Sequence, residues 1–219
     1  MTATIHAALA GEYIGGLDPW LRALVRSPRP QGRANAANVL ARRALRAGGH
    51  PDARAWVACV LAARVGRERD PAALAGILRA LALLGPDAAP AARRIPGALN
   101  DLPGDADVLA AAAGLLAEIG PAAGSAVLEL LGHSDGEVRQ LAAWLAGVTD
   151  CSILGVAELT AALDSADETT RCGAAWSLGQ AGATAAPVVG KLLRMAHTEA
   201  GKGKFVARIA ARRILRAAE

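Results

Sequence analysis

Histidine and cysteine are the side chains that most often serve as catalytic bases, nucleophiles or metal ligands, and this chain uses them sparingly. No two histidines share the i, i+4 spacing of a helical metal motif, and no cysteines form a CxxC pair. No Ser–His–Asp or Cys–His set can be read from the spacing. The sequence therefore predicts a protein that is not an enzyme and has no metal and no cofactor. The residues concerned are His6, His50, His133, His197, Cys59, Cys151 and Cys172.

The surroundings of these residues predict where the protein works. The cysteines lie in apolar helical stretches, which indicates buried, reduced thiols in a reducing compartment. His133 lies in a turn between two expected helices, where a solvated side chain is the plain interpretation. Met1–Leu9 shows no secretory signal, and no uncharged apolar run is long enough to span a bilayer. We therefore expect a cytoplasmic protein without a membrane segment.

Two tryptophans recur at one repeat position and are the strongest candidates for binding. Trp144 and Trp176 each stand five residues after an arginine in segments that match at a separation of 32. Equivalent positions elsewhere hold Arg79, Gly114 and Arg212. Exposed Trp and Arg side chains are the types that anchor interfaces. Trp144, Trp176, Arg212 and Arg79 are therefore the predicted partner-binding residues. In the alternative interpretation, the indoles fill space between alanine-rich helices.

Charge is distributed unevenly along the chain. Residues 1–94 carry +8, residues 95–170 carry −11 and residues 171–219 carry +7, which gives the net charge of +4. Basic ends flanking an acidic middle favour a charged partner or self-association. Near the C-terminus, Lys202, Lys204 and Arg208 are candidate phosphate contacts, or simply a solvated face. The segment Gly201–Lys204 is predicted to be a flexible basic loop, and it lacks the Walker pattern.

The elements that position these residues are helices in pairs. Alanine is abundant and aromatic residues make up only 3% of the chain, which favours helices over strands. Similar segments recur every 31–37 residues, and Gly-Pro at 85–86 and 120–121 ends a helix and blocks its continuation. We expect helix pairs at 18–47, 52–84, 87–119, 122–148, 152–181 and 184–217, with a short helix near 3–14.

The best-matching segments resemble a known repeat. Gly120-Pro121, Leu128 to Leu131 and the run from Asp135 to Ala143 are similar to HEAT repeats of the bacterial PBS-lyase-like, armadillo-type class, and the run from Asp167 to Gly179 matches again. The resemblance covers about residues 70–217 and implies an all-α fold, a right-handed α-solenoid of about six HEAT-like hairpins. It also implies that charged residues tie adjacent repeats together as a ladder. The ladder candidates are Asp135, Arg139, Asp167 and Arg171.

Fold class and site candidates together predict a function. Residues 1–70 are expected to form an irregular helical cap of the same solenoid, and residues 71–219 the repeats. The leading hypothesis is a non-catalytic scaffold or adaptor that binds a protein partner on its concave face. The alternative is a nucleic-acid-binding protein related to the HEAT-like alkylpurine DNA glycosylases, against which the acidic middle counts. A lesser alternative, an accessory protein like the bilin lyases, rests on the shared repeat alone.

Overall fold

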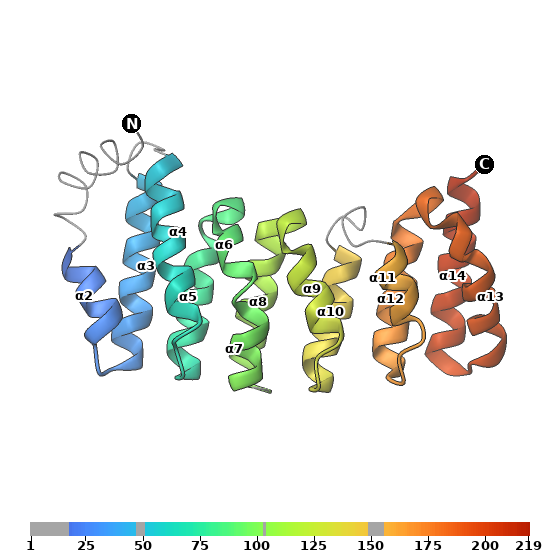
Figure 1. The fold of residues 1–219 in the computed structure, drawn as a ribbon, viewed down its shortest axis with the longest axis horizontal. Helices are drawn as coiled ribbons and strands as arrows, with labels where there is room; N and C mark the ends of the chain where they lie inside the picture. Colours follow the sequence, from blue (N-terminus) through green and yellow to red (C-terminus); the bar gives the residue numbers. More distant parts are fainter. Residues whose placement is uncertain (1–17, 47–50, 103, 149–155) are drawn as a thin grey trace. The chain divides into compact units, whose positions relative to one another are not determined.

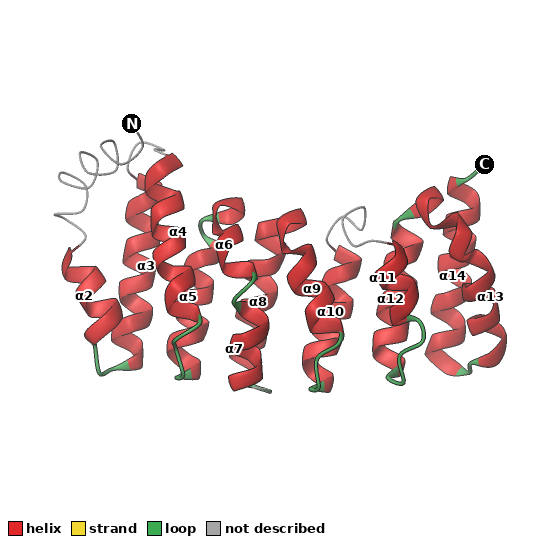
Figure 2. Ribbon diagram, in the orientation of Figure 1, coloured by secondary structure: helices red, strands yellow, loops and turns green. Residues whose placement is uncertain are grey.

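The computed structural model describes residues 18–46, 51–102, 104–148 and 156–219. These residues form helices and short connections, with no strand among them (Figure 2). The chain divides into two compact units, Met1–Leu115 and Leu116–Glu219. Each unit is built from consecutive helical hairpins, so the predicted all-α solenoid class is confirmed.

Unit 1 contains the first hairpins of the chain (Figure 1). Helix α3 packs against both α2 and α5, and α4 packs against α5 and α6. The first two hairpins are α2–α3 and α4–α5, and the short helices that follow form a third hairpin with α8. The boundary between the two units falls inside α8. The elements are α2 (Asp18–Arg26), α3 (Pro30–Arg46), α4 (Pro51–Val65), α5 (Pro71–Ala82), η1 (Gly85–Ala88), α6 (Ala89–Ala92), α7 (Ile95–Asp101) and α8 (Ala106–Ile119).

Unit 2 contains three further hairpins, α9–α10, α11–α12 and α13–α14 (Figure 1). The second helix of each hairpin packs on the second helix of the next, α10 on α12 and α12 on α14. The elements are η2 (Gly120–Ala123), α9 (Gly124–Leu131), α10 (Gly136–Val148), α11 (Val156–Ala162), α12 (Glu168–Gln180), η3 (Gly182–Val188), α13 (Val189–Thr198) and α14 (Gly201–Ala217).

The predicted helix pairs agree with these hairpins to within a few residues. The expected helix near 3–14 lies outside the described residues, as does Cys151. The predicted division at residue 70 falls inside unit 1, between the two helices of the α4–α5 hairpin. One expectation is wrong: the segment Gly201–Lys204 is the first turn of α14 and not a loop. Glycines at 201 and 203 hid this turn, because glycine is a poor helix former.

An aspartate cap begins four of the second helices. The carboxylates of Asp70, Asp105, Asp135 and Asp167 each accept a hydrogen bond from the backbone N–H three residues later, at 2.7–3.2 Å. This satisfies one of the amide groups that a helix leaves unpaired at its start. The helix ends use glycine: Gly85, Gly120 and Gly182 follow a second helix with φ of 57°, 64° and 58°. Only glycine adopts that conformation without strain.

One stretch, 106–131, is long and apolar enough to pass a length-and-hydropathy test for a membrane-spanning helix. In the structure Gly120 takes a left-handed conformation within it, and Pro121 follows. The stretch is therefore divided into α8, η2 and α9 rather than forming one straight helix.

Small residues let the second helices approach closely. A Cβ atom on Gly76 of α5 would lie 2.3 Å from the Ala34 Cβ of α3, and one on Gly179 of α12 would lie 2.8 Å from the Ala210 Cα of α14. No real side chain tolerates such distances, so these glycines are required by the packing. The alanine-rich composition thus serves close stacking of the second helices within each unit.

Candidate interaction surface

Trp144 and Trp176 are both solvent-exposed, at 55% and 37% of their surface. They lie on α10 and α12, which pack against each other. Each tryptophan stands nine residues after the capping aspartate of its helix, Asp135 or Asp167, and we call this the ninth position. Two large aromatic side chains therefore occupy the same position of adjacent helices and remain open to solvent.

The buried residues show that the ninth position is equivalent in every second helix that starts with a capping aspartate. Four buried positions recur with the same spacing, and the ninth position always lies between the second and third of them. The ninth position therefore has the same orientation relative to the core in each of these helices. The buried sets are Ala73, Ile77, Ala80 and Leu81; Val108, Ala112, Leu115 and Leu116; Val138, Ala142, Leu145 and Ala146; and Thr170, Ala174, Ser177 and Leu178.

The arginine beside Trp176 is Arg213, and the predicted equivalence of Arg212 to the tryptophan position is wrong. The guanidinium carbon of Arg213 lies 4.4 Å from the centre of the Trp176 ring, a cation–π contact. Arg213 also donates to the Gln180 side chain. The buried set of α14 places Ile209 at the ninth position, because Gly203, Ala207 and Ala211 follow their α12 counterparts by 33 residues. The sequence does not mark this spacing, because α14 lacks a capping aspartate.

In unit 1 the ninth position carries no aromatic side chain. Arg79, predicted to bind a partner, is exposed and forms an ion pair of 3.2 Å with Asp107 on α8. At Gly114 nothing lies within 4 Å of where a Cβ would stand. Arg79 therefore interacts within unit 1.

The predicted ladder residues in unit 2 contact the preceding turn and the next hairpin. Arg139 donates from Nη1 to the carbonyl oxygens of His133 and Ser134, both at 2.7 Å, and its Nη2 lies 3.7 Å from Asp167. Arg171 donates in the same way to the carbonyls of the turn before its own helix, at 2.8 Å, and its Nε donates to Glu199 at 2.6 Å. Each arginine thus ties its own turn to the acid of the following hairpin.

Asp167 combines capping with this ladder. Its carboxylate accepts hydrogen bonds from the backbone N–H and the hydroxyl of Thr170, both at 2.7 Å. The hydrogen bond from the Thr170 hydroxyl lowers the pKa of Asp167 most, and the Thr170 N–H and Arg139 lower it further. Together these interactions outweigh burial, which by itself would raise this pKa. The carboxylate therefore stays ionised and keeps both contacts.

Unit 1 has a ladder that sequence analysis missed. Arg33 on α3 donates from Nε and Nη2 to the two carboxylate oxygens of Glu68, both at 2.9 Å, and from Nη1 to the Ser27 carbonyl. Arg64 donates from Nη2 to Oε2 of the same carboxylate at 2.8 Å. Burial alone would raise the pKa of Glu68, but the hydrogen bonds from both arginines outweigh it and lower this pKa to about 2.

Glu68 is only 3% exposed, so the two arginines are its counterions in place of water. In unit 2 the ladder acid Asp167 is also the capping residue of its helix, so the cap marks it in the sequence. Glu68 instead precedes the capping Asp70 by two residues, so no such signal marks it as a ladder acid.

The basic residues of α14 are distributed along the length of the helix. Lys202, Lys204 and Arg208, the candidate phosphate contacts, are all exposed. They belong to one helix together with Arg212, Arg213 and Arg216. These side chains come from successive turns of the helix and therefore do not converge on one point.

Histidine and cysteine placements correct two further expectations. His133 is buried rather than solvated, and its Nδ1 accepts a hydrogen bond of 3.0 Å from the Asp135 backbone N–H. Cys59 is exposed and Cys172 half-buried, where both were predicted to be buried. In helices lined with alanine, the sequence pattern does not distinguish the inner face from the outer one.

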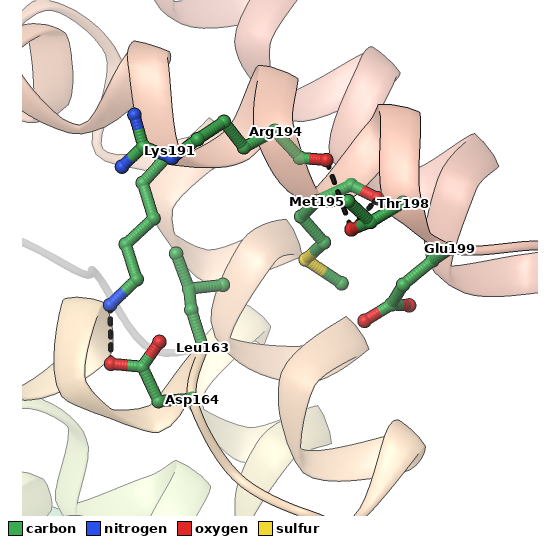
Figure 3. A pocket seen from close by; sticks show the side chains of 7 residues that line it. All are labelled: Leu163, Asp164, Lys191, Arg194, Met195, Thr198 and Glu199. Carbon is green, nitrogen blue, oxygen red and sulfur yellow. Dashed lines mark hydrogen bonds and ion pairs between the residues drawn. The ribbon is translucent and has the colours of Figure 1, made fainter.

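A shallow pocket of about 250 Å³ lies in unit 2 beside α13 (Figure 3). Lys191 at one side pairs with Asp164 at 2.6 Å, and Glu199 at the other side is held by Arg171. The Thr198 hydroxyl is bonded to the carbonyl of Arg194. These polar groups are engaged with each other or with the backbone and do not converge on the pocket. In the described part of the chain, no group of three His, Cys, Asp or Glu side chains could hold a metal ion.

Comparison with known proteins identifies a fold. No family model matches the chain, and no curated protein matches it. One similar solved structure is an engineered protein with 20% identity, covering 90% of this chain and 98% of its own, at a TM-score of 0.51. Another engineered protein has 22% identity, coverages of 92% and 97%, and a TM-score of 0.47. A designed armadillo repeat protein in complex with the peptide (KR)4 has 16% identity, coverages of 90% and 99%, and a TM-score of 0.49.

The first of these likenesses, at a TM-score of 0.51, bears on the fold alone. In its architecture the chain is an all-α solenoid of helical hairpins.

Proposed function

We propose that this protein is a non-catalytic interaction scaffold that binds a partner polypeptide through the face of α10 and α12 bearing Trp144 and Trp176. One observation carries the proposal: two indoles occupy the same ninth position on adjacent, packed helices and stay exposed. The repeat-solenoid fold is a scaffold whose exposed helix faces serve as binding surfaces.

The chemistry of this face fits a polypeptide. An indole combines a large apolar surface with an N–H donor, so it gains most when a partner covers it. Arg213 lies over the Trp176 ring and so restricts its motion, which lowers the entropy lost on binding. Gln140 and Gln180 are exposed one turn away from Trp144 and Trp176, where their amides can bond to a partner's backbone.

A pull-down from native lysate tests the proposal. The wild type is compared with Trp144→Ala, Trp176→Ala and the double variant, each with and without nuclease. We expect nuclease-resistant partners whose recovery falls about tenfold in the double variant, since truncating a hot-spot residue costs about 2 kcal/mol or more. Leu83→Ala is the matched control, because Leu83 is an exposed apolar side chain of unit 1.

Two results would contradict the proposal. Unchanged recovery in the double variant would remove the tryptophan face as the binding site. Capture that disappears with nuclease would favour nucleic acid, and duplex DNA titrated at low and moderate salt would then show a steep loss of affinity with salt.

A further inference from the structure

Helix α14 presents a stripe of side chains on the side that faces away from α12. Gly179 of α12 lies beside Ala210 of α14, and Gly182, in η3 just after α12, lies beside Ala217. Arg212 stands 33 positions after Gly179, so by the same geometry it points away from α12. Phe205, Arg208 and Leu215 share its side of the helix.

This outer stripe, defined by Phe205, Arg208, Arg212 and Leu215, is open to solvent. Phe205 is 66% exposed and Leu215 50%. Arg208 and Arg212 are exposed and have no ion pair or hydrogen bond to any described residue. The spacing i, i+3, i+7, i+10 keeps all four on one side of the helix over about 15 Å. Two apolar side chains therefore frame two unpaired guanidinium groups.

The ladder indicates what charge should cover this side. Lys204 is the counterpart of Arg139 and Arg171, because each stands four residues after the N-cap position of its helix. The two arginines each meet an acid of the next hairpin, Asp167 or Glu199. Lys204 is exposed and has no such acid among the described residues. An acidic group is therefore the complement that this side of α14 lacks among the described residues.

The α14 helix of a second copy does not supply that charge. Stacking α14 on the α14 of another copy would bring Arg208 and Arg212 against themselves. Like charges placed face to face repel, so the charge pattern favours a different, acidic partner.

We propose that the outer stripe of α14 binds an acidic amphipathic helix of a partner protein. Phe205 and Leu215 would pack against apolar residues at the two ends of the bound segment. Arg208 and Arg212 would pair with carboxylates between them, with Lys204 nearby. This surface is distinct from the tryptophan face and does not depend on the function proposed for it.

Fluorescence anisotropy with defined probes tests the proposal on the full chain. One probe is a labelled helical peptide of about 18 residues with two glutamates framed by leucines at the spacing of the stripe. Its twin carries lysine in place of glutamate. We expect the wild type to bind the glutamate peptide about tenfold more tightly than the lysine peptide, because two charge pairs form in place of two repulsions.

Two paired variants sharpen the result. Arg208→Glu/Arg212→Glu should reverse the preference and select the lysine peptide. Phe205→Ala/Leu215→Ala should lower the affinity for the glutamate peptide about tenfold, while the protein still prefers the glutamate peptide to the lysine peptide. Trp144→Ala/Trp176→Ala is the control and should bind as the wild type does, which separates this surface from the tryptophan face. All substituted side chains are exposed, and circular dichroism checks that the helices remain.

Several outcomes would overturn the proposal. The first is equal or absent binding of the two peptides by the wild type. The second is tighter binding of a short DNA duplex, lost in the Arg208→Glu/Arg212→Glu variant, which would identify the stripe as a nucleic-acid contact. The third is concentration-dependent self-association abolished by the same variant in sedimentation, which would identify a second copy as the occupant.

Discussion

The two units use the same helix positions for different purposes. In unit 1 the ninth position holds Arg79, which pairs with Asp107, and Gly114, which leaves the surface bare. In unit 2 it holds Trp144 and Trp176, both open to solvent. The same repeat position therefore holds an internal ion pair in one unit and exposed aromatic surface in the other.

The ladders differ in burial as well. Unit 1 centres its ladder on Glu68, which is buried between two arginines. Unit 2 has a chain of partly exposed pairs, Arg139 with Asp167 and Arg171 with Glu199. A buried charge depends on its partners far more than an exposed one does. The comparison teaches that the ladder of unit 1 depends on one buried carboxylate, whereas the ladder of unit 2 consists of partly exposed pairs.

The largest expected effect is the loss of the Glu68 charge. Glu68→Gln would leave Arg33 and Arg64 without their counterion, and removing one member of a buried charge cluster costs about 3–5 kcal/mol of unfolding free energy. Arg171→Ala in unit 2 should cost only about 1 kcal/mol, because its pair with Glu199 is partly exposed. Urea denaturation of both variants measures the difference, and equal losses would refute the contrast between the ladders.

The same cluster should make unit 1 sensitive to acid. The pKa of Glu68 falls from an ordinary 4.5 to about 2 in the folded protein, so its stabilisation is complete above pH 4.5 and is lost as the pH falls towards 2. Stability measured across this range in the wild type and in Glu68→Gln should converge at the acid end. A constant difference between the two proteins down to pH 2 would show that the Glu68 carboxylate is not the group responsible.

Replacing a closely packed glycine should lower the stability of both units to a similar extent. Gly76→Ala and Gly179→Ala each place a methyl group against a rigid neighbour, Ala34 or Ala210, and overpacking of this kind costs about 1–3 kcal/mol. The melting temperature of each variant measures this. A neutral result at either position would mean that the second helices separate there without loss.

The smallest expected effect has the opposite sign. Gly114 lies inside α8 with open space around it, so Gly114→Ala should stabilise the protein by about 0.5–1 kcal/mol through the helix preference of alanine. The melting temperatures of Gly114→Ala and Gly76→Ala, each compared with the wild type, distinguish a glycine that can be replaced from one that the packing requires. Destabilisation by Gly114→Ala would indicate a neighbour at the ninth position of unit 1.

Local patterns in the sequence were sufficient to predict most of the fold. The capping aspartates, the Gly-Pro turns and the repeat of about 32 residues located the hairpins, because caps and breaks act within a few residues of chain. The same local signals drew attention to Trp144, Trp176 and the ladder arginines. They failed at α14, which has no capping aspartate and begins with Gly201 and Gly203.

The sequence by itself determined the helices, their pairing into hairpins and the type of residue at each repeat position. Only the tertiary structure decided which side chains meet. It placed Arg213 rather than Arg212 on Trp176, brought Glu68 between Arg33 and Arg64, and left Phe205 exposed. The physical reason is that helix formation depends on neighbours along the chain, whereas burial and pairing depend on how alanine-rich helices rotate against each other, and a uniform alanine surface leaves that rotation unmarked in the sequence.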